Sequence, residues 1–317
     1  MIALLLATAA VAFPEEKEST PEERAIAYLA REVPRWSAKN KCYSCHNNGV
    51  AARALYAAKR QKMDVPANAL EDTSRWLARP ADWAHNGGEG PFNDKVLSGI
   101  QFAASLADAI DSGLVRDRQA LERAAKLVAE AQTKDGYWQI GAEGAIGSPA
   151  TLGTPLATVL ARRTLHCANP EGHRERIASA DRWLRRVPVK SVLDAAAVTL
   201  GLEDAKDENS RSQRERCLAL IRKGEAKAGG WGPYVTSPPE PFDTAVVVLA
   251  LARMPDLPPT RDMLTRGRAY LISAQQEDGS WKESTRPSGG DSYAQRIATT
   301  GWALQALVAT RPNSSAK

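Results

Sequence analysis

The chain has 317 residues, of which 43% are hydrophobic and 25% charged, an ordinary composition for a soluble globular protein that excludes a disordered chain. Its 22 glycines and 19 prolines follow no short period, which excludes a collagen-like chain, and 4 cysteines are too few for a disulfide scaffold. The net charge of +5 comes from 42 basic and 37 acidic residues that are dispersed along the chain, so nucleic acid is not an expected partner.

The first residues resemble an export signal. Residues 2–12, IALLLATAAVA, form an apolar run that is too short to span a bilayer and ends in a small-x-small cleavage pattern. No positive segment precedes the run, and an uncleaved anchor or a buried helix are the alternatives. We predict a signal peptide over residues 1–12, a mature chain over 13–317 that does not span the membrane, and a periplasmic or secreted location, where cofactors can be attached to thiols.

Residues 42–46, Cys-Tyr-Ser-Cys-His, form the CxxCH motif of c-type haem attachment. In this chemistry the thiols of Cys42 and Cys45 add to the two vinyl groups of one porphyrin, and His46 binds the iron as its proximal ligand. His85 is the candidate distal ligand, with a solvated loop histidine as the alternative. A thiol redox pair, half of a zinc site and a chance match are alternatives for the motif. Zinc is not expected, because no second Cys/His pair follows at a suitable spacing.

Tryptophan recurs along the chain at intervals of about fifty residues, which indicates an internal repeat. These residues are Trp36, Trp83, Trp138, Trp183, Trp231 and Trp281. Residues 132–138 and 275–281 both read QxxDGxW, and residues 225–231 follow the same pattern with Glu in place of Gln and Ala in place of Asp. The glycine in this pattern is typical of a left-handed helix stop. Each such turn therefore separates a charged helix before it from an apolar helix after it.

Alternation of charged and apolar helices predicts the fold. The apolar helices are expected at residues such as 152–162, 243–253 and 298–310. A helix that is apolar on most faces is buried, so these helices should form an inner ring and the charged helices an outer ring. We count six such pairs, or about twelve helices, and no convincing strand. The sequence thus predicts an all-α (α/α)6 toroid, and since one repeat cannot bury its own face, residues 13–317 should form a single domain.

The QxxDGxW turns and the Thr-Ala-rich helices after them resemble the squalene-hopene cyclase and prenyltransferase toroid family over residues 22–310. In class II cyclases of that family, a DxDD-Thr-Ala segment opens an inner helix, and its middle Asp is the general acid. The matching stretch here begins at Glu240 and places Phe242 at the position of the proton donor. The resemblance therefore implies no class II cyclisation, with Asp243 as a helix cap and Glu240 as a substitute acid in principle. Neither Cys167 nor Cys217 matches the zinc-binding motif of the prenyltransferases.

Two functions follow from these patterns, and whether the chain is an enzyme stays open. One is an exported toroid that carries a covalent haem c, has an electron-transfer or redox role and works with an unknown redox partner. The other is a toroid that binds an apolar small molecule of polyisoprenoid type. A structural interaction module is a third function. Asn93, Asp194, Glu240 and Asp243 lie at the starts of expected inner helices and could form a polar rim above an apolar cavity, although helix capping alone would explain them.

Overall fold

The computed structural model describes residues 19–86, 94–254, 258–284, 286 and 292–312. The predicted signal peptide and Asn93 lie outside these residues. Within them, no helix combines the length and the apolar character that crossing a membrane requires.

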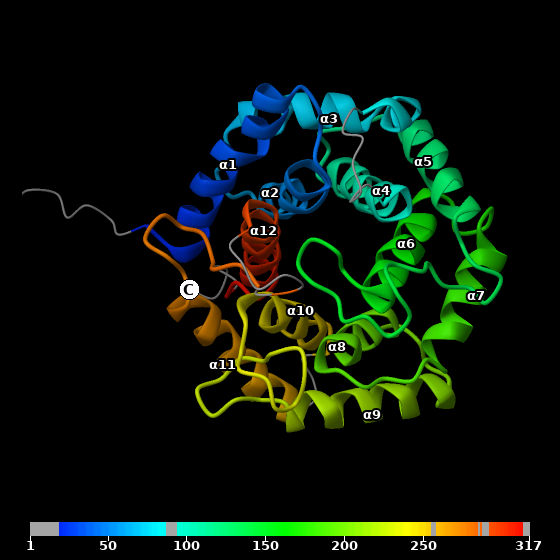
Figure 1. Ribbon diagram of the computed structural model, residues 1–317, viewed down its shortest axis with the longest axis vertical. Coiled ribbons are helices and arrows are strands. Elements are labelled where there is room, and N and C mark those ends of the chain that lie inside the picture. The colour runs from blue at the N-terminus through cyan, green and yellow to red at the C-terminus, as the bar shows by residue number, and fades with distance from the viewer. Residues whose placement is uncertain (1–18, 87–93, 255–257, 285, 287–291, 313–317) are drawn as a thin grey trace, which may run out of the picture.

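The described residues contain twelve α-helices, which form two concentric rings (Figure 1). The outer ring consists of α1 (Pro21–Asn40), α3 (Glu71–Leu77), α5 (Arg118–Glu130), α7 (Arg174–Leu184), α9 (Glu208–Lys223) and α11 (Pro258–Ser273). The inner ring consists of α2 (Ala52–Arg60), α4 (Lys95–Asp111), α6 (Thr154–Ala168), α8 (Val192–Gly201), α10 (Pro241–Ala252) and α12 (Tyr293–Ala309). Each inner helix contacts the next, and α12 contacts α2, so the inner ring is closed. The predicted (α/α)6 toroid is confirmed.

Three short helical segments complete the first two repeats. The π-helix η1 (Cys45–Ala51) runs directly into α2, and the 3-10 helices η2 (Ala67–Ala69) and η3 (Pro80–His85) flank α3. The CxxCH motif therefore lies in the connection between the first outer helix and the first inner helix.

Burial explains the division into rings. On α10, every side chain from Phe242 to Leu251 except Leu249 is buried, because inner helices pack on both sides and an outer helix packs behind them. On the outer helix α5, the apolar residues Leu121, Ala124, Ala125 and Val128 face the core while the charged residues between them are exposed. Burying this apolar face stabilises the helix in water, since most helical stability in proteins comes from tertiary packing.

The three QxxDGxW-type turns use one set of hydrogen bonds. In each turn the indole N–H of the tryptophan donates to a carbonyl near the end of the preceding outer helix, and its main-chain N–H donates to a threonine of the following inner helix. The indole donors and their acceptors are Trp138 to Val128 at 2.7 Å, Trp231 to Ile221 at 2.8 Å and Trp281 to Leu271 at 2.7 Å. The threonines are Thr158, Thr244 and Thr300. Each turn thereby ties an outer helix to its inner partner.

The other tryptophans of the fifty-residue period are not equivalent to these three. Trp36 lies inside α1, Trp183 lies near the end of α7, and Trp83 lies in η3. The regular spacing located the repeat correctly, but equal spacing did not mean equal structural roles.

The ring closes where the last turn meets α1. The side-chain amide of Gln275 donates to the carbonyl of Pro21 at 2.8 Å and accepts from Arg24 at 2.6 Å, and Arg268 pairs with the buried carboxylate of Glu22. Gly279 has a φ of +88°, and a Cβ at this position would lie 2.3 Å from the carbonyl oxygen of Arg24. Only glycine allows this turn to approach α1 so closely.

A long connection, residues 139–153, reaches over the middle of the ring (Figure 1). Gln101 on α4 donates to the carbonyl of Ala150 at 2.9 Å, and Gln295 on α12 donates to the hydroxyl of Ser148 at 3.0 Å. Side chains from the two inner helices that flank α2 thus hold this connection over the ring.

Candidate functional site

The CxxCH segment is held by side chains on both sides of it. Asn86 accepts from the main-chain N–H of Tyr43 at 2.8 Å and donates to its carbonyl at 2.6 Å. The Tyr43 ring stacks on Trp76 with a centroid distance of 4.2 Å, and its hydroxyl donates to Asp72 at 2.9 Å. The hydroxyl of Ser44 accepts from the main-chain N–H that is three residues ahead and so caps η1. These contacts fix the backbone of the motif before any ligand is present.

Cys42, Cys45 and His46 line one cavity of about 750 Å³. Its other walls are mostly apolar and aromatic and come from α1, η3, α4 and α5, including Trp36, Trp83, Ile100, Phe102, Leu127 and Val128. The volume lies within the range of about 300–1,000 Å³ that is common for ligand pockets. Apolar walls with a few polar groups are also typical of such pockets.

Burial controls the protonation of the motif. It raises the pKa of the Cys45 thiol to about 12 and lowers the pKa of His46 to about 4, because both charged forms are poorly solvated. The Cys45 sulfur lies 3.5 Å from Nδ1 of His46. At neutral pH this is a pair of a neutral thiol and a neutral imidazole. The neutral Cys45 thiol is not the thiolate that a nucleophilic or redox cysteine needs. The neutral His46 imidazole keeps a lone pair that can bind a metal.

Cys42, Cys45, Cys167 and Cys217 are all free thiols. Cys217 is buried on α9 and Cys167 is half-buried at the end of α6, away from the motif. Within the described ranges, no three His, Cys, Asp or Glu side chains gather closely enough to hold a metal ion by themselves.

Two hydrogen-bond donors in the cavity wall were not anticipated from the sequence. The indole nitrogens of Trp36 and Trp83 are buried and have no hydrogen-bond partner, unlike those of Trp138, Trp231 and Trp281. A buried donor without a partner costs about 1–3 kcal/mol. The indole nitrogen of Trp302, which lies outside this cavity, is likewise buried without a partner, so the two unsatisfied donors do not by themselves indicate a bound group.

His85 is the last residue of η3, and its side chain is exposed. Its neighbours Ala84 and Asn86 line the cavity, whereas His85 itself does not. The structure therefore places the predicted distal ligand beside the cavity rather than in its wall.

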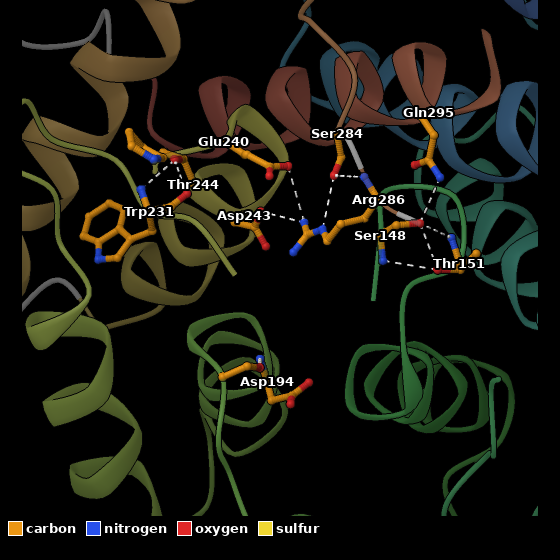
Figure 2. A network of polar contacts seen from close by, with 12 residues as sticks. Ser148, Thr151, Asp194, Trp231, Glu240, Asp243, Thr244, Ser284, Arg286 and Gln295 are labelled. Carbon is orange, nitrogen blue, oxygen red and sulfur yellow. Dashed lines mark hydrogen bonds and ion pairs between the residues drawn. The ribbon is translucent and has the colours of Figure 1, made fainter. Parts of the chain in front are cut away.

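A second polar cluster lies at the start of α10 (Figure 2). The carboxylate of Asp243 is fully buried and accepts from Nη2 of Arg286 at 2.7 Å, and the carboxylate of Glu240 lies 3.6 Å from the same nitrogen. Burial, together with Glu240, raises the pKa of Asp243 to about 7 against the opposing effect of Arg286. Asp243 was expected to cap α10, but α10 has no side-chain cap and Asp243 pairs with Arg286 instead. Sequence reasoning missed Arg286, which lies in a loop with no repeat pattern.

The remaining residues of the predicted rim do not join this cluster. Asp194 lies in the first turn of α8, and Figure 2 shows it on the neighbouring helix without a contact to Asp243 or Arg286. Burial raises its pKa. Ser191, not Asp194, provides the cap of α8. Asn93 lies outside the described residues.

Phe242 occupies the core rather than an open cavity. Its side chain is fully buried and packs edge-on against Trp302, with the ring centroids 5.9 Å apart. The position that the resemblance assigns to a proton donor therefore carries a phenyl ring in a packed interior.

Comparisons with known proteins agree with this architecture. No family model matches the chain. Drimenyl diphosphate synthase from Streptomyces showdoensis is 32% identical over 108 residues, which is 34% of this chain and only 20% of that protein. Type II terpene cyclase MstE from Scytonema superimposes with a TM-score of 0.58 at 14% identity, over 91% of this chain and 96% of the cyclase.

A variant of the same cyclase in complex with its substrate geranylgeranyl dihydroxybenzoate also gives a TM-score of 0.58, at 16% identity, over 91% of this chain and 96% of the cyclase. A candidate GH105 protein from Salmonella enterica gives 0.57 at 12% identity over 98% of both chains. At these identities the solved structures establish the fold alone. The chain thus has an α/α toroid fold similar to that of the type II terpene cyclases.

Proposed function

We propose that this chain is a toroid that binds an apolar ligand of polyisoprenoid type and does not carry out class II cyclisation. Phe242 carries the second part of this proposal, because a buried phenyl ring has no proton to give to an alkene. The first part is supported by the apolar and aromatic cavity and by the fold shared with a cyclase that was solved with a geranylgeranyl substrate.

Gly99 offers a direct test of binding in this cavity. It lies on α4 in the cavity wall, and a Cβ added there would meet no atom within 4 Å. Gly99→Leu should fill part of the cavity, and it should also favour the helix, since Gly is about 1 kcal/mol less favourable than Ala in a helix interior. We expect squalene or geranylgeraniol to bind to the parent protein in native mass spectrometry, and binding to weaken in Gly99→Leu but not in Gly99→Ala.

The absence of cyclisation is tested by incubation of the purified protein with squalene and with geranylgeranyl diphosphate. Recovery of unchanged substrate is the expected result. Cyclic products formed at enzymatic rates would contradict the proposal and would point to Glu240 or Asp243 as the acid.

A specific observation favours a second candidate, an exported protein with a covalent c-type haem. All three chemical groups of the CxxCH motif, the two thiols and the imidazole, line one cavity with aromatic walls. Cys42 and Cys45 would hold the porphyrin covalently, His46 would bind its iron, and the aromatic walls would exclude water. When bound, such a group supplies one-electron chemistry to an unknown redox partner. Attachment outside the cytoplasm would need the signal peptide over residues 1–12.

This second candidate predicts a mass gain. Expression with export and a haem-attachment system should give a coloured chain that is heavier by about one haem and keeps it after denaturation, because thioethers are covalent. Cys42→Ala with Cys45→Ala should lose the colour, whereas Cys167→Ala, which changes a thiol elsewhere, should keep it. A colourless protein with free thiols would eliminate the haem and leave the apolar ligand as the function.

A further inference from the structure

The cavity beside the CxxCH motif contains several polar side chains, and their other contacts determine what they can do. The side-chain amide of Asn86 binds the main chain of Tyr43 through both of its ends, and the Tyr43 hydroxyl binds Asp72. The Ser44 hydroxyl caps η1. Indole nitrogens are donors only. The indoles therefore offer no lone pair to a metal, the Asn86 amide and the Ser44 hydroxyl are held by the main chain, and the Tyr43 hydroxyl keeps its proton in the bond to Asp72 instead of being the phenolate that binds iron.

Histidine and methionine are the usual second axial ligands of a haem, with cysteine and tyrosine as further protein ligands. Apart from His46 and the two attachment thiols, the cavity wall contains no histidine, methionine or further cysteine among the described residues. His85 is exposed beside the wall. The sequence of residues 87–93, GGEGPFN, contains no such residue either.

The other histidines and methionines of the described residues lie elsewhere in the toroid. His166 is exposed at the end of α6, and His173 contacts Glu122 on α5. Met63 and Met254 follow the C-terminal ends of α2 and α10, whereas the motif precedes the N-terminal end of α2. Met263 is buried on the outer helix α11. Lys95 is the only amine in the wall, and its side chain is exposed, so its ammonium would have to lose both its water and a proton to bind a metal.

From this accounting we infer that a haem held by Cys42, Cys45 and His46 keeps its second axial position free of protein ligands, so that the cavity binds a small exogenous ligand at the iron. The inference rests on the haem candidate of the proposed function. It assigns the cavity a ligand-binding role, whereas a haem with two protein ligands would leave no place for a further ligand at its iron. The expected ligand is a small neutral or anionic molecule with a lone pair.

Carbon monoxide on the reduced protein and cyanide on the oxidised protein are the probes. We expect a high-spin ferric spectrum, one carbon monoxide per haem, and less than about a twofold change in affinity in either His85→Ala or Lys95→Ala, since neither residue competes for the iron. A side chain that occupied the iron nine-tenths of the time would weaken the apparent affinity for carbon monoxide about tenfold. Replacing that side chain by alanine would restore the affinity.

The outcomes separate the inference from the function on which it depends. A covalent haem with a low-spin spectrum that becomes high-spin in His85→Ala or Lys95→Ala would overturn the inference and leave the haem function intact. A low-spin haem that fails to bind carbon monoxide in all three proteins would also overturn it. A protein that gains no haem mass would overturn both, and Cys42→Ala with Cys45→Ala gives the reference spectrum for that case.

Discussion

Thr299 and Thr300 are neighbours on α12, yet their hydroxyls have different surroundings. Both side chains are fully buried. The Thr300 hydroxyl accepts from the main-chain N–H of Trp281 at 3.2 Å and donates to the carbonyl of Arg296 at 2.8 Å, whereas the Thr299 hydroxyl has no partner. One hydroxyl therefore completes a turn, and the other is a buried polar group without compensation.

Replacement of each threonine by valine should separate these two roles. Thr300→Val leaves the Trp281 N–H unsatisfied and should destabilise the protein by about 1–3 kcal/mol. Thr299→Val removes an uncompensated hydroxyl at nearly constant shape and should be neutral or stabilising. Urea unfolding at one pH measures both variants, and equal losses in the two would refute the role of Thr300 in the turn.

The buried carboxyl of Asp243 should make stability depend on pH. Burial raises its pKa from the ordinary value of about 3.9 for an aspartate to about 7, so between about pH 4 and pH 7 the folded chain binds more protons than the unfolded chain. Stability then falls as the pH rises through this window, by at most about 1.4 kcal/mol per unit. Below the window the contribution of Asp243 is fully present.

Asp243→Asn removes this titration while keeping the shape of the side chain. The stability of the parent minus that of Asp243→Asn should therefore decrease from pH 4.5 to pH 7, as measured by urea unfolding at several pH values. A difference that stays constant over this range would show that Arg286 keeps Asp243 charged throughout.

The turn that follows α11 is the clearest case in which a short element determines packing at a distance. Gly279 lies in the turn beyond the end of α11 at Ser273, has a positive φ, and lies against the main chain of α1, which is far away in sequence. Gly136 makes the same kind of approach to Ser179 on α7, at 2.5 Å from an ideal Cβ to the carbonyl oxygen. The prediction that this glycine stops the helix is wrong, because α5 and α11 end at Glu130 and Ser273, well before Gly136 and Gly279. The repeat uses the glycine to admit the next outer helix.

Gly279→Ala tests this close approach against a matched control. Gly113 has a similar φ of +79°, but a Cβ there would meet nothing within 4 Å. Gly113→Ala should cost only the left-handed backbone strain, about 1–2 kcal/mol. Gly279→Ala should cost more, because the turn must also move away from α1. Thermal unfolding of the two variants measures the difference, and equal losses would mean that the contact with α1 is not constrained.

Ring closure makes the whole molecule depend on contacts between its first and last helices. Arg268 on α11 donates to the carbonyl of Leu307 at 2.7 Å and pairs with Glu22 on α1, whose side chain is 5% exposed. In a closed ring each repeat has two neighbours, so the loss of one interface exposes apolar surface on both sides of it.

Glu22→Ala removes the carboxylate that compensates the charge of Arg268 at this closure. Loss of one partner of a buried ion pair costs about 3–5 kcal/mol, whereas an exposed pair contributes about 0–1 kcal/mol. Glu71→Ala breaks such an exposed pair, with Arg75, and is the control. Urea unfolding should show a large loss for Glu22→Ala and a small one for Glu71→Ala. Similar small losses would show that the closure does not depend on this pair.

Patterns within about fifty residues were sufficient to predict the two rings. The QxxDGxW turn is completed almost entirely by contacts within the turn and its two flanking helices, such as Trp231 with Ile221 and Thr244. Helix stops and apolar faces are likewise local properties of the chain. For that reason the alternation of charged and apolar helices predicted both the all-α class and the number of pairs.

The contacts that build the candidate sites depend instead on loops that carry no period. Asn86 holds Tyr43 from 43 residues away, and Arg286 reaches Asp243 across the same sequence separation of 43 residues. The motif predicted that Cys42, Cys45 and His46 act together, since they are adjacent in sequence. Only the folded chain decided which walls surround them and that His85 lies outside the cavity, because a side chain's neighbours are determined by how distant segments pack.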